Sequence, residues 1–133
     1  RLSSLEQEAQ RAQKGNEVVA YAKKYLGGRY VFGGNNLNTG VDCSGFVQQI
    51  MKHFGVSMAR SSREQYRTNG VKVKEAEIMP GDLVYYGNGG TVNHAAIYIG
   101  NDQIIHANTE STGIIISDLH YGKPIIGIKR VLK

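Results

Sequence analysis

The first half of the chain places its apolar residues at helical spacing. The clearest pattern runs from Ser44 to Phe54, and Gly55 supplies a C-terminal cap. Four apolar residues fall on one face of this predicted central helix: Val47, Ile50, Met51 and Phe54. A shorter packing helix is expected from Asn16, as its N-cap, to Tyr25, with the Gly27-Gly28 pair as its stop.

A third helix is predicted to begin at Ser61 or Ser62. Glu64 and Gln65 follow these serines at a spacing of three, so a capping box can form in either register, and Asn69-Gly70 closes the helix. Between the first two helices, residues 30–40 are rich in Gly and Asn. This composition predicts a loop whose backbone can approach a ligand closely.

After residue 80 the apolar positions change to strand spacing. A Pro80-Gly81-Asp82 turn opens the region, and a hairpin is expected around Gly100-Asn101. The predicted strands are Leu83–Tyr86, Val92–Ile99, Gln103–Ala107, Ile114–Ser117 and Ile125–Leu132. Helices followed by an antiparallel meander predict an α+β domain, with one face of the sheet buried against the central helix.

Residues 1–15 differ from the rest of the chain. They are rich in Gln, Glu, Ala and Arg, and their only large apolar residues are Leu2 and Leu5. We expect an exposed helical tail or linker over 1–15 and a single folded domain over 16–133. The chain begins with Arg1 and shows no signal-peptide pattern. We therefore expect a monomeric catalytic module taken from a longer, multidomain protein.

Composition narrows the choice of function. The 133 residues carry a net charge of +5, which favours encounter with polyanions such as anionic cell-wall polymers, or serves solubility alone. The basic residues are scattered, without the clustered stripe typical of nucleic-acid binding, and no apolar run is long enough to span a bilayer. A single cysteine excludes an internal disulfide and the common CxxC zinc patterns.

That cysteine, Cys43, occupies a position suited to a nucleophile. It lies at the start of the predicted central helix, within Asp42-Cys43-Ser44-Gly45, where unpaired N–H groups and the helix dipole favour a thiolate. Its own backbone N–H could stabilise the oxyanion of a tetrahedral intermediate. A lone cysteine is more often a small buried apolar residue, so the catalytic interpretation depends on its partners.

His94 and His106 are the expected partners. They fall on sequential strands that are predicted to pair. An odd loop centred near Gly100, or a bulge with Gly100 or Asn101 at positive φ, would place both rings on one face, whereas a two-residue loop would separate them. In the favourable geometry His94 takes the thiol proton and later protonates the leaving amine, while His106 orients His94.

A metal site is the alternative use of the same three side chains. Thiolate and imidazole both bind zinc, but Cys43, His94 and His106 lack close ligand spacing and an evident fourth ligand. We therefore expect no metal and no cofactor. His53 and His120 lie outside this grouping, and we interpret them as structural.

Five segments together resemble the NlpC-type cell-wall peptidases, in the same order and with the same spacing, from Asn16 to the C-terminus. The segments are Gly28-Arg29-Tyr30-Val31-Phe32-Gly33-Gly34, Asp42-Cys43-Ser44-Gly45, Pro80-Gly81-Asp82-Leu83, His94-Ala95-Ala96-Ile97-Tyr98-Ile99-Gly100 and Ile105-His106-Ala107. The resemblance implies a papain-like cysteine peptidase fold. It also implies hydrolysis of peptidoglycan stem peptides between γ-D-glutamate and the following diamino acid, meso-diaminopimelate or L-lysine, by a secreted or wall-associated enzyme.

The resemblance further implies a set of substrate-binding residues. Tyr30 would hold the substrate carbonyl or oxyanion, and the pocket for the D-glutamyl portion would be lined by Asp42, Ser44, Arg60, Ser61 and Ser62. Arg and hydroxyl groups suit the free α-carboxylate of a γ-linked glutamate. Asp42, Ser61 and Ser62 can equally serve as helix caps. The sequence departs from the family at Met58-Ala59, where a proline is usual, and at Phe32, where a larger aromatic is common.

Two other functions fit the same pattern. A related amidase or acyltransferase could use the same Cys and His pair on a different amide or ester. A non-enzymatic wall-binding module could keep the fold without the chemistry. We expect the peptidase.

Overall fold

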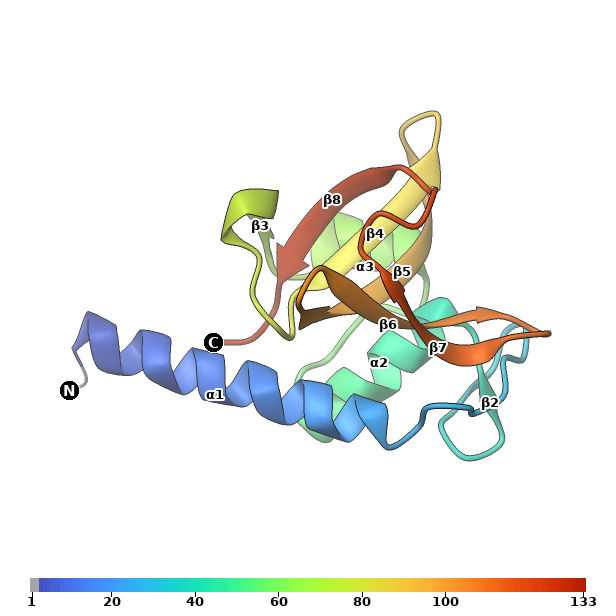
Figure 1. Cartoon of the computed structure of the whole chain (residues 1–133), viewed down its shortest axis with the longest axis horizontal. Coiled ribbons are helices and arrows are strands. Elements are labelled where there is room, and N and C mark those ends of the chain that lie inside the picture. Colours follow the sequence, from blue (N-terminus) through green and yellow to red (C-terminus); the bar gives the residue numbers. More distant parts are fainter. Residues whose placement is uncertain (1–2) are drawn as a thin grey trace.

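Three helices and a six-stranded sheet form the computed structural model, which describes residues 3–133 (Figure 1). The helices are α1 (Ser4–Lys23), α2 (Cys43–His53) and α3 (Ser62–Thr68), with a 3₁₀ turn η1 at Glu75–Glu77. The strands are β1 (Asn35–Asn36), β2 (Gly40–Val41), β3 (Val71–Val73), β4 (Leu83–Asn88), β5 (Thr91–Gly100), β6 (Gln103–Thr109), β7 (Gly113–Asp118) and β8 (Ile125–Arg130). The predicted α+β class, with helices before an antiparallel sheet, is confirmed.

Helix α1 begins thirteen residues earlier than the helix predicted to follow an N-cap at Asn16, and that predicted N-cap is wrong. Ser3 caps the helix instead, and Ser3 and Glu6 form a reciprocal capping box. The intervening residues are mostly strong helix formers, so nothing interrupts the helix at residue 15. Gly15 does not end a helix. It allows α1 to pack closely against Pro80, because a Cβ at residue 15 would lie 2.1 Å from the Pro80 carbonyl oxygen.

The two other helices follow their predicted caps. Asp42 is the N-cap of α2, and its side chain accepts a hydrogen bond from the Gly45 N–H. Ser61 caps α3 by accepting from the Glu64 N–H at 3.2 Å, so the first of the two predicted registers is present. The Glu64 carboxylate pairs with Arg67 instead of returning to the cap, so the box is only half formed.

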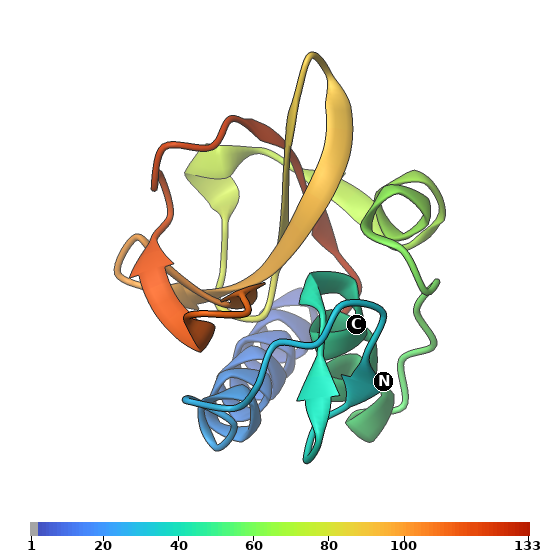
Figure 2. The same ribbon diagram turned by 90° about the vertical axis from the view of Figure 1, so that its right-hand side faces the viewer.

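The large sheet has the order β3-β8-β4-β5-β6-β7, and every neighbouring pair is antiparallel. Strands β4 to β7 form the predicted meander, in which each strand pairs with the next, but β8 does not pair with β7. It returns to the other edge of β4 and also pairs with β3, a three-residue strand that the sequence analysis missed. Figure 2 shows the resulting strong curl of the sheet, with α1 and α2 together on one side.

One face of the sheet is buried against α2, as predicted, and apolar residues of the central strands are buried on the other face as well. Phe46, Val47 and Ile50 of α2 pack against one face in the larger apolar cluster. A second cluster covers the other face and contains Val84, Tyr86, Ala96, Tyr98, Ile104, Leu119 and Ile128. Strand β4 is consequently buried on both sides from Leu83 to Gly87. Within residues 3–133, no helix has the length and apolar character that crossing a membrane requires.

Candidate active site

Cys43 is the first residue of α2, which places its sulfur among unpaired N–H groups of the helix terminus. The sulfur also lies beside the backbone N–H groups of Ala95 and Ser44, and both lower the pKa of the thiol. Burial has the larger effect and raises that pKa. The side chain is only partly buried. Cys43 therefore lies next to strand β5 as a neutral thiol with anion-stabilising donors in place.

The two predicted histidines meet. His94 Nε2 and His106 Nδ1 are 2.7 Å apart, and the two rings pack edge to face. Both side chains are buried, with exposed fractions of 6% and 0%. Because Ala95 contacts the Cys43 sulfur and follows His94 directly, the ring pair lies on the strand that the thiol approaches. The expectation that His94 and His106 share one face is confirmed.

The turn between β5 and β6 has the backbone conformation that this geometry requires. Gly100, Asn101 and Asp102 have φ values of 94°, 53° and 58°. Two consecutive positive φ angles at Asn101 and Asp102 give a type I′ turn, which suits the twist of a hairpin. The predicted positive φ at Gly100 or Asn101 is present at both residues.

A bulge at Ile99 then sets the register. Ile97 pairs with Ile105, whereas Gly100 pairs with Gln103, so one extra residue lies on β5 between these pairs. The two-residue turn alone would place His94 and His106 on opposite faces, and the extra residue reverses that outcome. Before the bulge, the paired residues of β5 and β6 are symmetric about residue 101, not about residue 100 as predicted. The rings of His94 and His106 therefore meet diagonally instead of directly opposite each other.

A third group, Ser117, continues the line of hydrogen bonds. His106 Nε2 lies 2.9 Å from Ser117 Oγ, which is carried by β7. Ser117 was not predicted as a site residue, although it lies on a predicted strand adjacent to that of His106. The imidazole of His106 is thus held at both nitrogens, by His94 on one side and by Ser117 on the other.

Burial keeps both imidazoles neutral. It lowers the pKa of His94 to about 3, with further lowering from the charges of His106 and Lys123, and it lowers the pKa of His106 to about 4. Tyr121 contributes to this enclosure, since its ring lies edge to face with that of His106 at a centroid distance of 5.1 Å. Tyr121 carried no signal in the sequence, because it lies in the irregular segment between β7 and β8.

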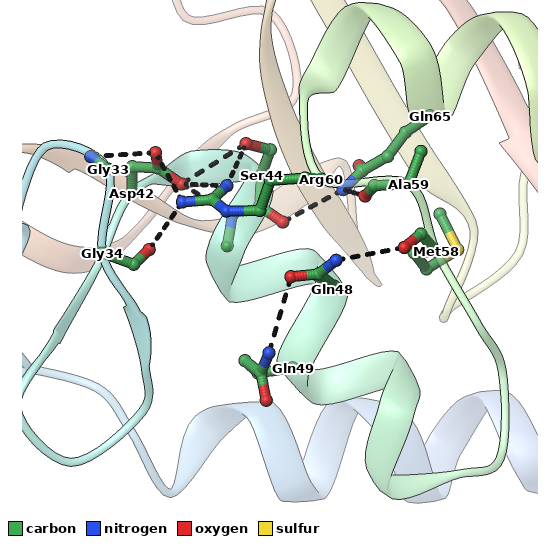
Figure 3. Close-up of polar contacts among 11 residues, drawn as sticks. Gly33, Gly34, Asp42, Ser44, Gln48, Gln49, Met58, Ala59, Arg60 and Gln65 are labelled. Carbon is green, nitrogen blue, oxygen red and sulfur yellow. Dashed lines mark hydrogen bonds and ion pairs between the residues drawn. The ribbon is translucent and has the colours of Figure 1, made fainter.

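Arg60 ties the start of α2 to the preceding loop (Figure 3). Its two terminal nitrogens bind the two Asp42 carboxylate oxygens at 3.0 and 3.1 Å. They also donate to Ser44 Oγ at 3.0 Å and to the Gly34 carbonyl oxygen at 3.1 Å. Bidentate pairs of this kind fix geometry as well as charge. The structure therefore brings Asp42, Ser44 and Arg60 together directly beside Cys43.

The remaining predicted binding residues are spread around this cluster. Tyr30 is partly buried and bridges to Val41, and burial and the charge of Cys43 raise the pKa of its hydroxyl. It lines an open hollow with Phe32 and residues 108–111. Ser61 is an exposed helix cap, and Ser62 is nearly buried.

Gln65, a fully buried amide, is a second residue of the site that was not predicted. Its nitrogen donates to the carbonyl oxygens of Ser44 and Ala59 at 3.0 and 2.9 Å, and its oxygen accepts from the Tyr85 hydroxyl at 3.0 Å. Every polar group of this side chain is thus used, and it joins α3 to the first turn of α2 and to β4. Only its position in the predicted capping box marked it in the sequence.

Other histidines have different surroundings. His53 stacks on Tyr21 at a centroid distance of 3.8 Å, and His120 Nε2 lies 2.8 Å from Glu75 Oε2 at the surface. Across residues 3–133, no group of three or more His, Cys, Asp or Glu side chains is arranged to hold a metal ion.

The fold and site together define an α+β domain in which a helix-borne cysteine lies beside the strand that carries His94, and His94 is hydrogen-bonded to His106 on the next strand. The sequence profile of the NlpC/P60 family matches residues 27–128, and the chain belongs to that family.

Curated relatives and solved structures support the same family assignment. The bifunctional muramidase/DL-endopeptidase CwlT of Bacillus subtilis is 39% identical over 108 residues, which are 79% of this chain and 32% of CwlT. Murein DD-endopeptidase MepS/murein LD-carboxypeptidase of Escherichia coli K12 is 44% identical over 97 residues, 72% of this chain and 50% of MepS. A solved NlpC/P60 family protein of Bacillus cereus has a TM-score of 0.84 and 30% identity, covering 90% of this chain and 40% of that one.

The chain spans between about a fifth and a half of the length of the curated relatives it matches. These relatives are named as endopeptidases, and the fold of this chain is that of their shared domain.

Proposed function

We propose that the chain is a cysteine peptidase that hydrolyses peptidoglycan stem peptides between γ-D-glutamate and the following diamino acid, meso-diaminopimelate or L-lysine. One observation carries the proposal: the line His94, His106 and Ser117 begins on the strand that adjoins the Cys43 sulfur. The relative CwlT, named as a DL-endopeptidase, supports this bond as the target. Such an enzyme would act outside the cell, secreted or attached to the wall.

The proton path follows from the ring contacts. His94 Nε2 bonds His106, so Nδ1 is the ring nitrogen left free, and in this scheme it takes the proton of the thiol. As the substrate carbonyl approaches, the Cys43 Sγ–H proton passes to Nδ1 and the sulfur attacks the carbonyl carbon. The helix terminus and the N–H groups of Ser44 and Ala95 stabilise the charge that forms on sulfur.

Collapse of the tetrahedral intermediate releases the amine. The oxyanion lies toward the Cys43 N–H, with the Tyr30 hydroxyl as a second donor. The imidazolium of His94 returns its proton to the leaving amine, and a thioester remains on Cys43. Water, deprotonated by the same Nδ1, then hydrolyses the thioester. His94 is neutral at rest, so its free ring nitrogen carries a lone pair that can accept the proton.

Substrate recognition would use the cluster around Arg60. The free α-carboxylate of the γ-linked glutamate would meet the exposed edge of Arg60 and the hydroxyls of Ser61 and Ser62. Asp42 and Ser44 already bind the guanidinium, so their main contribution would be to aim it. In this scheme Arg60 is pre-oriented before the peptide arrives, which reduces the entropy lost on binding.

The relative MepS favours a second target, the cross-link or the C-terminal residue of the stem, because its name describes DD-endopeptidase and LD-carboxypeptidase activity. Defined muropeptides separate these targets by the mass of their products. Release of a γ-D-glutamyl fragment supports the bond proposed here, whereas loss of a terminal D-alanine or opening of a cross-link supports the alternative.

Replacement of the nucleophile tests the enzymatic claim. Cys43→Ala is expected to lower the rate of fragment release from purified peptidoglycan by at least about 10³-fold, because loss of a covalent nucleophile removes most of the rate enhancement. Mass spectrometry of the digest measures the products. His53→Asn, on the same helix, is the matched control and should retain activity. Undiminished release by the Cys43→Ala protein would show that the cleavage does not depend on this sulfur.

A further inference from the structure

A basic cleft lies outside the candidate active site, between α3, β3, β8 and the hairpin that joins β4 to β5. Four of its lining side chains are cationic: Arg63, Arg67, Lys72 and Lys129. The aromatic ring of Tyr66 lies among them, 5.9 Å from Lys72 Nζ and 5.4 Å from Lys129 Nζ. Four positive charges from three separate elements thus face one hollow.

Two of these lysines are direct cross-strand partners. Lys72 of β3 pairs with Lys129 of β8 in the antiparallel register. Like charges in directly opposite positions destabilise a sheet, so this pair has a cost for the folded protein. Contact with the Tyr66 ring offsets part of that cost through cation–π attraction.

The burial of Lys129 adds to the free-energy cost of this lysine pair in the folded protein. Its side chain is only 6% exposed, and its ammonium group donates to the Tyr66 carbonyl oxygen at 2.8 Å. Burial and the charge of Lys72 both lower its pKa. Within residues 3–133, no carboxylate lies within ion-pair distance of this ammonium group. Buried cations are usually paired, so the cleft lacks a counter-charge.

The one carboxylate on this side of α3 is already engaged. Glu64 accepts from Arg67 Nη2 at 2.6 Å and from Arg67 Nε at 3.2 Å. That pairing leaves Arg63, Lys72 and Lys129 as the source of net positive charge. Arg63 and Lys72 are exposed, so an incoming anion can reach them from solvent.

We infer that this cleft binds phosphodiester groups of an anionic polyol-phosphate polymer. The exposed guanidinium of Arg63 and ammonium group of Lys72 can donate to the oxygens of a phosphate, and Lys129 adds positive charge behind them. This choice of polymer rests on the proposed function, because such a polymer would have to share the wall with peptidoglycan. Val92 lines the cleft and precedes His94 by two residues on β5. A bound polymer would therefore hold the active site close to the wall.

Titration calorimetry with a synthetic glycerol-phosphate oligomer tests the inference. The wild-type chain is expected to bind it, with an affinity that falls as NaCl rises. Arg63→Gln and Lys72→Gln should each weaken binding about fivefold, since a cation near an anionic surface contributes on this scale. Lys23→Gln removes an equal charge from an exposed site on α1 and should leave the affinity unchanged. Equal affinities for all three variants would overturn the inference.

Two further probes identify the source of the phosphate. Inorganic phosphate should bind more weakly than the oligomer, and equal binding of both would overturn the polymer assignment. Single-stranded DNA with the same number of phosphates should not exceed the oligomer in affinity, and tighter DNA binding would assign the cleft to nucleic acid instead. None of these probes contains a peptide bond, so the result is independent of whether the chain hydrolyses peptidoglycan.

A stability measurement provides an independent check. Without added anion at low salt, Lys72→Gln should raise the melting temperature, because it removes the repulsion of Lys129 across β3 and β8. The oligomer should raise the melting temperature of the wild type more than that of the variant. A lower melting temperature for Lys72→Gln would show that Lys72 is a stabilising structural residue and would contradict the inference.

Discussion

The tautomer of each active-site imidazole follows from its ring partners. For His94 Nδ1 to accept a proton, Nε2 must carry the hydrogen and donate it to His106 Nδ1. His106 must then carry its own hydrogen on Nε2 and donate it to Ser117 Oγ. The Ser117 hydroxyl can accept this hydrogen, so the tautomers that the proposed mechanism needs are compatible with every hydrogen bond in the line.

Ser117 is accordingly a positioning residue. Ser117→Ala is expected to lower kcat about tenfold with little change in KM, because the His106 N–H loses a hydrogen-bond acceptor worth about 1.4 kcal/mol and the ring that orients His94 is held less firmly. Steady-state kinetics on a defined muropeptide measures the change.

Ser117→Thr keeps the hydroxyl and is the matched control, so it should recover most of the rate. A purely structural role would instead lower the melting temperature of Ser117→Ala and leave kcat unchanged.

At the scale of elements, the docking of α1 depends on the absence of a side chain at Gly15. Its Cα lies close to Gly81 as well as to Pro80, so the helix touches the turn that leads into β4. Gly15→Ala is expected to lower the free energy of unfolding by about 1–3 kcal/mol, because the added methyl forces helix and turn apart. This loss exceeds the ~1 kcal/mol that alanine gains in helix propensity.

Urea denaturation followed by circular dichroism measures the effect. Gln13→Ala, two residues earlier on the exposed face of α1, is the matched control and should be neutral or slightly stabilising. A Gly15→Ala protein that is more stable than the wild type would mean that α1 is not held by this contact.

Local patterns predicted the elements well and their long-range pairing poorly. Helix α2 was expected over Ser44–Phe54 and spans Cys43–His53, because apolar spacing and caps lie within the helix itself. The return of β8 to β4 was missed, since it depends on contacts some forty residues apart along the chain. The Asn16 cap failed for a different reason, because a stronger capping box at Ser3 starts the same helix earlier.

The same distinction applies to the site. Cys43, His94 and His106 could be found because each lies within a short motif and the hairpin restricts how the two rings can meet. The hydroxyl of Ser117 and the amide of Gln65 act through contacts made by cross-strand or cross-helix packing, eleven and twenty-one residues from their partners. No local pattern distinguishes them from other polar residues on a strand or helix.

At the scale of the whole molecule, the buried histidines make stability depend on pH. Both have folded-state pKa values of about 3 and 4, below the unfolded value near 6.5, so the unfolded chain binds more protons at acidic pH. Their contribution is fully present above pH 6.5 and is lost as pH falls toward 4. The free energy of unfolding should therefore decline from pH 6.5 with a slope approaching about 2.7 kcal/mol per pH unit near pH 5.

Urea titrations between pH 7.5 and pH 5 measure this slope. His106→Asn should reduce it by about half, whereas His120→Gln, at an exposed site, should leave it nearly unchanged. A wild-type slope near zero across this interval would contradict the neutral, buried state assigned to the two rings.

The raised pKa of Cys43 has a further chemical consequence. Oxidants and soft electrophiles react with thiolates and far more slowly with thiols, and burial holds this sulfur in the protonated form. In the mechanism proposed above, the sulfur becomes strongly nucleophilic only when its proton passes to His94. The resting protein should therefore resist alkylation by iodoacetamide and inactivation by peroxide.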